Sequence, residues 1–121
     1  MSNARRTIAV DFDGVIHAYT AGWCDGQIYD PPVVGVRAGL KKLQAEGFFV
    51  VVYSCRANSP GLLREMTNWL DKQMIPYDDI WSDTGKPAAR MYIDDRAWSF
   101  VSWSPEVVDQ IIQRASREDD K

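Results

Sequence analysis

Short apolar runs rich in β-favouring residues recur along the chain and are separated by segments with helical spacing. The runs fall at residues 8–10, 48–53 and 90–93, and a shorter run at 79–82 is compatible with a further short strand. The first run contains no polar position, which is typical of a parallel strand buried on both faces. None of the runs is long enough for a helix, so the pattern predicts a sheet of short strands.

Three segments place apolar residues at the spacing of an amphipathic helix. The first covers residues 36–46, the second follows the cap Asn58-Ser59-Pro60 and ends before Pro76, and the third begins at Ser104-Pro105-Glu106. Strands that alternate with helices are typical of α/β domains with right-handed crossovers. We therefore predict a three-layer α/β/α, Rossmann-like domain with a mainly parallel central sheet.

Length and composition narrow the class of protein. The 121 residues suffice for one core, so we expect a single domain over residues 1–121, with a frayed charged tail at 116–121. No apolar run approaches the about 20 residues of a membrane span, and the N-terminus lacks the apolar stretch of a signal peptide, so we expect a cytoplasmic protein with no membrane partner. The net charge of -3 argues against non-specific nucleic-acid binding. Two distant cysteines predict neither a disulfide framework nor a zinc site.

Polar residues with catalytic potential follow the predicted strands. Asp11 and Asp13 come after the first strand, Ser54 after the second and Asp94-Asp95 after the last. Ligands of open parallel sheets bind beyond the carboxyl ends of the strands. Asp11 and Asp13 are two positions apart, so their side chains point the same way along an extended chain, and a divalent cation would relieve their repulsion. Taken alone, the same stretch is also compatible with a polar turn.

These residues, together with Lys86 in the loop before the last strand, suit the handling of a phosphoryl group. A carboxylate can attack phosphorus to form an acyl-phosphate, and Mg²⁺ neutralises the repulsion between anionic nucleophile and anionic substrate. Ser54 and Lys86 would bind the phosphoryl oxygens. Arg56 is a weaker candidate for binding a second anionic group of the substrate, the alternative being an exposed, solvated arginine.

The order and spacing of these motifs resemble those of the haloacid dehalogenase (HAD) superfamily, specifically its magnesium-dependent phosphatases. Val10-Asp-Phe-Asp-Gly-Val-Ile16 resembles the first motif of that family, Tyr53-Ser54 the second, Lys86 the third and Tyr92-Ile-Asp-Asp95 the fourth. The likeness spans nearly the whole chain. It implies a HAD-like fold, here without a separate cap domain, and hydrolysis of an organic phosphate monoester.

The resemblance also implies a role for each matching residue. Asp11 would be the nucleophile that forms an aspartyl-phosphate. Asp13 would protonate the leaving oxygen as general acid and then activate water as general base. Mg²⁺ would be bound by Asp11, the backbone carbonyl of Asp13 and Asp94, with Asp95 assisting directly or through water. Ser54 and Lys86 would hold the phosphate.

Residues 15–32 form a long, aromatic-rich connection without clear periodicity, and such connections are often functional. We expect a small flap over the tip of the first strand. His17, the only histidine, is expected to be structural rather than catalytic, because no partner stands at ligand spacing. Trp98 and Trp103 are expected in the core rather than stacked on a substrate ring.

The sequence does not identify the substrate. A phosphorylated small molecule is the leading expectation, and a phosphorylated nucleic-acid end or a phosphoprotein is the alternative. A phosphoryl-accepting switch similar to a response-regulator receiver uses the same residue types, but there the acidic pair comes early and the accepting aspartate stands alone on a middle strand. A non-catalytic binding module on the same fold is a third possibility. The oligomeric state is not predicted.

Overall fold

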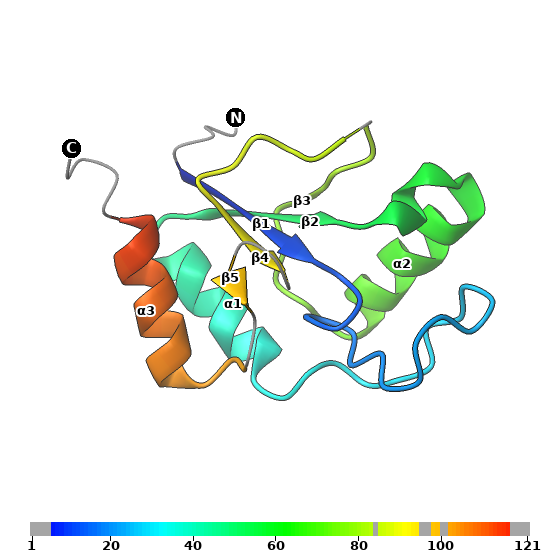
Figure 1. Cartoon of the computed structure of the whole chain (residues 1–121), viewed down its shortest axis with the longest axis horizontal. Helices are drawn as coiled ribbons and strands as arrows, with labels where there is room; N and C mark the ends of the chain where they lie inside the picture. Colours follow the sequence, from blue (N-terminus) through cyan, green and yellow to red (C-terminus); the bar gives the residue numbers. More distant parts are fainter. Residues whose placement is uncertain (1–5, 84, 95–97, 100–101, 117–121) are drawn as a thin grey trace.

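The computed structural model describes residues 6–83, 85–94, 98–99 and 102–116, with only the backbone described at 98–99. The elements, shown in Figure 1, are in chain order β1 (Thr7–Asp11), α1 (Val36–Ala45), β2 (Phe49–Tyr53), the 3-10 helix η2 (Cys55–Asn58), α2 (Pro60–Lys72), β3 (Asp79–Ile80), β4 (Met91–Asp94), β5 (Trp98–Ser99) and α3 (Pro105–Ala115). The predicted α/β class is therefore confirmed. The tail expected to fray lies outside the described residues except for Ser116.

The sheet has the strand order β3-β2-β1-β4-β5, and every neighbouring pair is parallel. Strand β1 is central and pairs with both β2 and β4. Asp11 stands opposite Tyr53, and Val10 stands opposite Ile93, so Asp94 follows at the level of Asp11 on the neighbouring strand. The two-residue β5, beyond β4, was not predicted from the sequence.

One face of the sheet carries the helices. Val10 and its register partners Val52 and Ile93 point to this face, and all three are fully buried. The helices add further buried residues to the same hydrophobic cluster: Val36, Leu40, Leu43, Met66, Leu70, Val108 and Ile111. Trp103 also belongs to the core, as expected, and its Nε1 donates a hydrogen bond to the Val15 carbonyl over 2.9 Å.

Segment 81–90 crosses the opposite face on its way from β3 to β4, away from α1 and α3 in Figure 1. Among its described residues there is no helix, in agreement with the loop predicted around Lys86. Two hydrogen bonds anchor it to the sheet: Arg90 N donates to the Thr7 carbonyl, and the Tyr92 hydroxyl donates to the Pro87 carbonyl. Because side chains alternate across a strand, Asp11, which follows Val10, points to this face.

No helix within the described part of the chain combines the length and the apolar character needed to cross a membrane.

Candidate functional site

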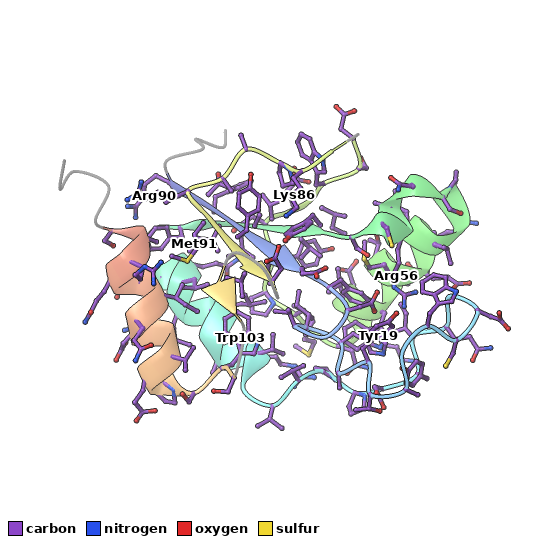
Figure 2. All side chains as sticks on the ribbon, viewed as in Figure 1. Tyr19, Arg56, Lys86, Arg90, Met91 and Trp103 are labelled. Atoms are coloured by element: carbon purple, nitrogen blue, oxygen red, sulfur yellow. The ribbon has the colours of Figure 1, made fainter. Side chains whose placement is uncertain are left out.

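Polar side chains near the carboxyl ends of β1, β2 and β4 form two groups. The Asp94 group comprises Asp11, Tyr53, Lys86 and Asp94, and the Asp13 group comprises Asp13, His17 and Arg56. Figure 2 shows Lys86 beside the sheet and Arg56 between α2 and the flap.

Asp94 is the centre of the first group. The residue is 4% exposed, and its Oδ2 accepts hydrogen bonds from the Tyr53 hydroxyl and, over 3.3 Å, from Lys86 Nζ. The Lys86 ammonium also lies 5.6 Å from the ring centre of Tyr53 and 5.1 Å from that of Tyr92. The structure therefore brings Lys86 to the predicted edge of the sheet, although Pro87 follows it directly.

No role was predicted for Tyr53 itself, which forms the second motif together with Ser54. Burial, and the hydrogen bond to Asp94, raise the pKa of Tyr53 above its ordinary value, so the phenol stays protonated and donates. The register of β1 and β2 was the signal that could have identified Tyr53, because Tyr53 stands opposite Asp11 and its side chain lies on the same face of the sheet.

Asp11 and Ser54 are each fixed by a local hydrogen bond. Asp11 is partly buried, and its Oδ1 accepts from the backbone N–H of Phe12 over 2.8 Å. Ser54 is the N-cap of η2, and its Oγ accepts from the backbone N–H of Arg56 over 3.1 Å. The cap orients the Ser54 hydroxyl, which can still donate its own hydrogen to an anion.

Arg56 is buried, contrary to the exposed arginine considered from the sequence. Its side chain is 1% exposed and makes three hydrogen bonds: Nε to Asp13 Oδ2 over 2.9 Å, Nη2 to Asp13 Oδ1 over 3.1 Å and Nη1 to the Gly26 carbonyl over 2.6 Å. The guanidinium thus binds both carboxylate oxygens of Asp13 as a fork. Arg56 is therefore the partner of Asp13 in this structure, and its contact with a substrate anion stays a prediction.

His17 has the partner that the sequence did not reveal. Its ring is fully buried, with Nδ1 2.8 Å from Asp13 Oδ1, and its Nε2 accepts from the backbone N–H of Asp30 over 3.1 Å. The backbone N–H of His17 donates to the Phe12 carbonyl, so the chain turns tightly after β1 and returns the imidazole to Asp13. The four-residue spacing of Asp13 and His17 was the available signal.

Residues 15–32, named the flap, are held together by polar contacts of their own. Asp30 Oδ2 accepts from the Thr20 backbone N–H over 2.6 Å and from the Thr20 hydroxyl over 2.7 Å, and the Tyr29 hydroxyl donates to the Gly22 carbonyl over 2.7 Å. The backbone and side-chain bonds from Thr20 lower the pKa of Asp30. The flap is therefore an ordered structure beside Asp13.

The oxygen donors at the end of β1 and β4 fit a hard divalent cation such as Mg²⁺. Asp11 and Asp94 supply carboxylates on the same face and level of the sheet, and the backbone carbonyl of Asp13 follows. No three His, Cys, Asp or Glu side chains group into a metal site in the described ranges, and Asp95 lies outside them. Mg²⁺ is commonly held by one or two carboxylates, with water and substrate phosphate completing its octahedral shell. The two carboxylates are compatible with that mode.

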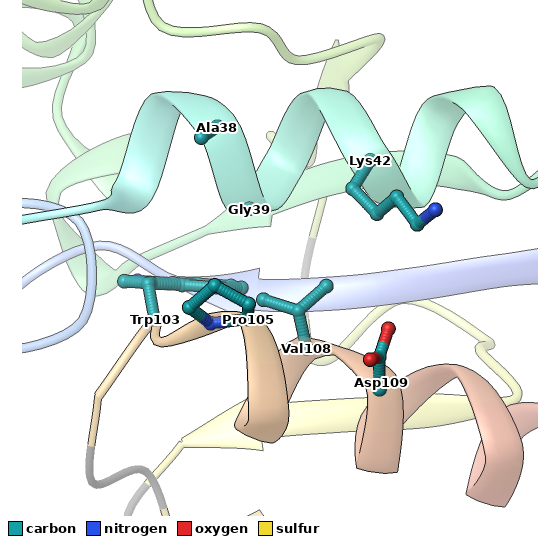
Figure 3. Close-up of a pocket in the computed structure, with 7 residues that line it drawn as sticks. All are labelled: Ala38, Gly39, Lys42, Trp103, Pro105, Val108 and Asp109. Carbon is teal, nitrogen blue, oxygen red and sulfur yellow. The ribbon is translucent and has the colours of Figure 1, made fainter.

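A separate cavity of about 350 Å³ opens between α1 and α3 (Figure 3). Trp103, Gly39 and Val108 form its apolar wall, and Lys42 and Asp109 lie at its rim. It is on the helical side of the sheet, whereas Asp11 points to the other side, so it is not part of the candidate site.

Two solved structures are similar to this chain. One is a conserved protein from Bacteroides thetaiotaomicron, with a TM-score of 0.68, 25% sequence identity and coverage of 89% of this chain and 90% of its own. The other is a protein from Vibrio cholerae known from a crystal structure, with a TM-score of 0.56, 26% identity and coverage of 96% and 99%. Their descriptions state no activity, so they support the fold. No protein-family model and no curated protein matches the chain.

Proposed function

We propose that the protein is a magnesium-dependent phosphohydrolase that cleaves an organic phosphate monoester through an aspartyl-phosphate on Asp11. One observation supports this most strongly: Asp11 and Asp94 extend from neighbouring strands to the same face and level of the sheet, and Lys86 reaches Asp94 there. Two carboxylates and an ammonium group at one strand edge suit the transfer of a phosphoryl group. The resemblance to HAD phosphatases rests on the same residues.

In the first half of the reaction, an Asp11 carboxylate oxygen attacks phosphorus, and the bond between phosphorus and the ester oxygen breaks. Asp13 gives a proton to the departing oxygen. Lys86 and the Ser54 hydroxyl contact the phosphoryl oxygens, whose charge spreads in the transition state. Ser54 suits this task because its cap bond to Arg56 N fixes the direction of its oxygen.

In the second half, water attacks the phosphorus of the aspartyl-phosphate, and Asp13 takes a proton from that water. The bond between phosphorus and the Asp11 oxygen breaks, which releases inorganic phosphate and restores the carboxylate. The forked hydrogen bonds from Arg56 fix the direction of the Asp13 carboxylate, as this proton transfer requires.

Mg²⁺ would be held by Asp11, Asp94 and the backbone carbonyl of Asp13, with Asp95 as a further candidate. When bound, it would neutralise charge between the nucleophile and the phosphoryl group. The Tyr53 hydroxyl holds Asp94 from the side, a partner of the kind that orients carboxylate ligands of metals. The leading substrate class is a phosphorylated small molecule.

A phosphate-release screen tests the proposal. A panel of sugar, nucleoside and aryl phosphates is assayed with and without Mg²⁺, using the wild type, Asp11→Asn and the matched control Asp109→Asn on the exposed side of α3. We expect magnesium-dependent release by the wild type and the control, and loss of release in Asp11→Asn. Absence of release from every member, or full release by Asp11→Asn, contradicts the proposed function.

A further inference from the structure

We infer that His17 and Arg56 are positioning residues that hold Asp13 from two sides, and that the flap is the scaffold that fixes them both. The catalytic part of this inference rests on the proposed function, in which Asp13 carries the proton. The hydrogen-bonded arrangement itself can be tested without any activity.

The bond to Asp30 defines which nitrogen of His17 carries the proton. A backbone N–H can only donate, so Nε2, which faces the N–H of Asp30 at 3.1 Å, is the unprotonated acceptor. The proton of the neutral ring is then on Nδ1 and points at Asp13 Oδ1, 2.8 Å away. The backbone of the flap thus selects the tautomer that lets His17 donate to Asp13.

Packing holds the imidazole in place. Four aromatic rings have their centres within 5.2 to 5.7 Å of the His17 ring centre, and they belong to Phe12, Tyr19, Tyr29 and Trp69. The ring is fully buried among them, so it cannot turn to exchange the positions of Nδ1 and Nε2 without displacing these neighbours.

Arg56 holds Asp13 from the other side and is itself held by the flap. Its Nη1 donates to the Gly26 carbonyl over 2.6 Å, and its guanidinium lies 5.1 Å from the Trp23 ring centre. Gly26 has a φ of +79°, and a Cβ there would lie 2.7 Å from Leu62 Cδ2, so glycine brings the flap close to α2 at this point.

Both positioning side chains are therefore anchored to the flap backbone, His17 at the Asp30 N–H and Arg56 at the Gly26 carbonyl. Asp13 receives three hydrogen bonds from these two buried groups. A carboxylate held in this way cannot rotate freely, and fixed orientation is what proton transfer to a bound substrate requires. The flap thus acts on the proposed reaction through the position of Asp13.

Nitrogen-15 NMR of the sole histidine tests the arrangement directly. The long-range spectrum of the wild type is expected to show a proton on Nδ1 and none on Nε2, as the hydrogen bond from the Asp30 N–H requires. Asp13→Ala is expected to move the Nδ1 resonance, and Asp109→Ala is expected to leave it unchanged. A ring protonated at Nε2 or at both nitrogens overturns the inference. So does an Nδ1 resonance that is the same in Asp13→Ala as in the wild type.

The catalytic part is tested with His17→Leu and His17→Asn on two substrates. Phenolate is a poor leaving group, so cleavage of phenyl phosphate depends on a proton donated to the ester oxygen. p-Nitrophenolate is a weaker base and leaves readily without that proton. We expect His17→Leu to lower kcat on phenyl phosphate about tenfold more than on p-nitrophenyl phosphate, with KM little changed. His17→Asn, whose side-chain amide can donate from the place of Nδ1, should recover most of the difference.

Equal losses on both substrates, as a general folding defect would give, contradict the positioning role. If the wild type releases no phosphate from any member of the phosphate panel while the NMR result is as expected, the proposed function fails and the hydrogen-bonded arrangement stands. If the wild type is active and the spectrum shows protonation at Nε2, the positioning inference fails alone.

Discussion

Replacement of Arg56 by methionine should destabilise the fold far more than replacement of any exposed arginine. The variant keeps an unbranched apolar stem in the buried space but leaves the Asp13 carboxylate without its forked partner. Removing one partner of a buried ion pair costs about 3–5 kcal/mol in the free energy of unfolding. The Asp13 side chain is 15% exposed, which places the expected loss near the lower end, at about 3 kcal/mol.

Urea unfolding followed by tryptophan fluorescence measures this loss as a shift in the free energy of unfolding at unchanged slope. Arg37→Met is the matched control, because the exposed Arg37 side chain also donates to a backbone carbonyl, that of Gln73, over 2.6 Å. We expect the control to change stability by about 1 kcal/mol or less.

A double-mutant cycle separates the ion pair from packing. Asp13→Asn combined with Arg56→Met removes the charge that the single change leaves unpaired, so the double variant should be more stable than the sum of the two single losses predicts. A loss in Arg56→Met no greater than in Arg37→Met, or strictly additive losses, would show that the Arg56–Asp13 pair does not stabilise the fold in this way.

Three further substitutions test the surrounding structure. Tyr53→Phe removes a donor to a proposed magnesium ligand and should weaken Mg²⁺ binding about 10–100-fold by calorimetry, whereas unchanged affinity contradicts the orienting role. Burial and the hydrogen bond to Asp71 raise the pKa of Tyr77 from 10.0 to about 12. The folded chain therefore keeps the phenol proton of Tyr77 to a higher pH than the unfolded chain, so the free energy of unfolding falls as pH rises from 10 to 12. Tyr77→Phe should lose less stability than the wild type over this pH range. Equal losses would show that Tyr77 does not cause this pH dependence. Gly39→Ala would place a Cβ 2.6 Å from the indole of Trp103 and should lower the melting temperature. Gly61→Ala is the control and should leave the melting temperature unchanged, because nothing lies within 4 Å of its Cβ position. A Gly39→Ala variant as stable as the wild type would contradict the close packing at Gly39.

The sequence predicted the order of the elements and the carboxyl-end position of Asp11, Ser54 and Asp94. These features depend on local periodicity and on the rule that strand tips collect functional residues, both of which are visible in one chain. Lys86 was also predicted, although only the path of segment 81–90 across the sheet brings its ammonium to Asp94.

The environments of Arg56 and His17 could not be predicted in the same way. A charged side chain in a loop is usually solvated, and only the folded flap buries Arg56 against Asp13 and the carbonyl of Gly26. The partner of His17 was four residues away but depends on a tight turn and on a backbone N–H from Asp30. Long-range backbone contacts of this kind produce no periodic pattern in the sequence.

The central claim is that Asp11 carries the phosphoryl group during turnover. Rapid acid quench of Asp13→Asn with a substrate from the phosphate-release screen, followed by mass spectrometry of the peptide around β1, tests it most directly. We expect one phosphoryl group on Asp11, accumulating in this variant because hydrolysis of the intermediate is slowed. Phosphate release by the wild type without any phosphorylated Asp11 in the variant, together with undiminished turnover by Asp11→Asn, would contradict it.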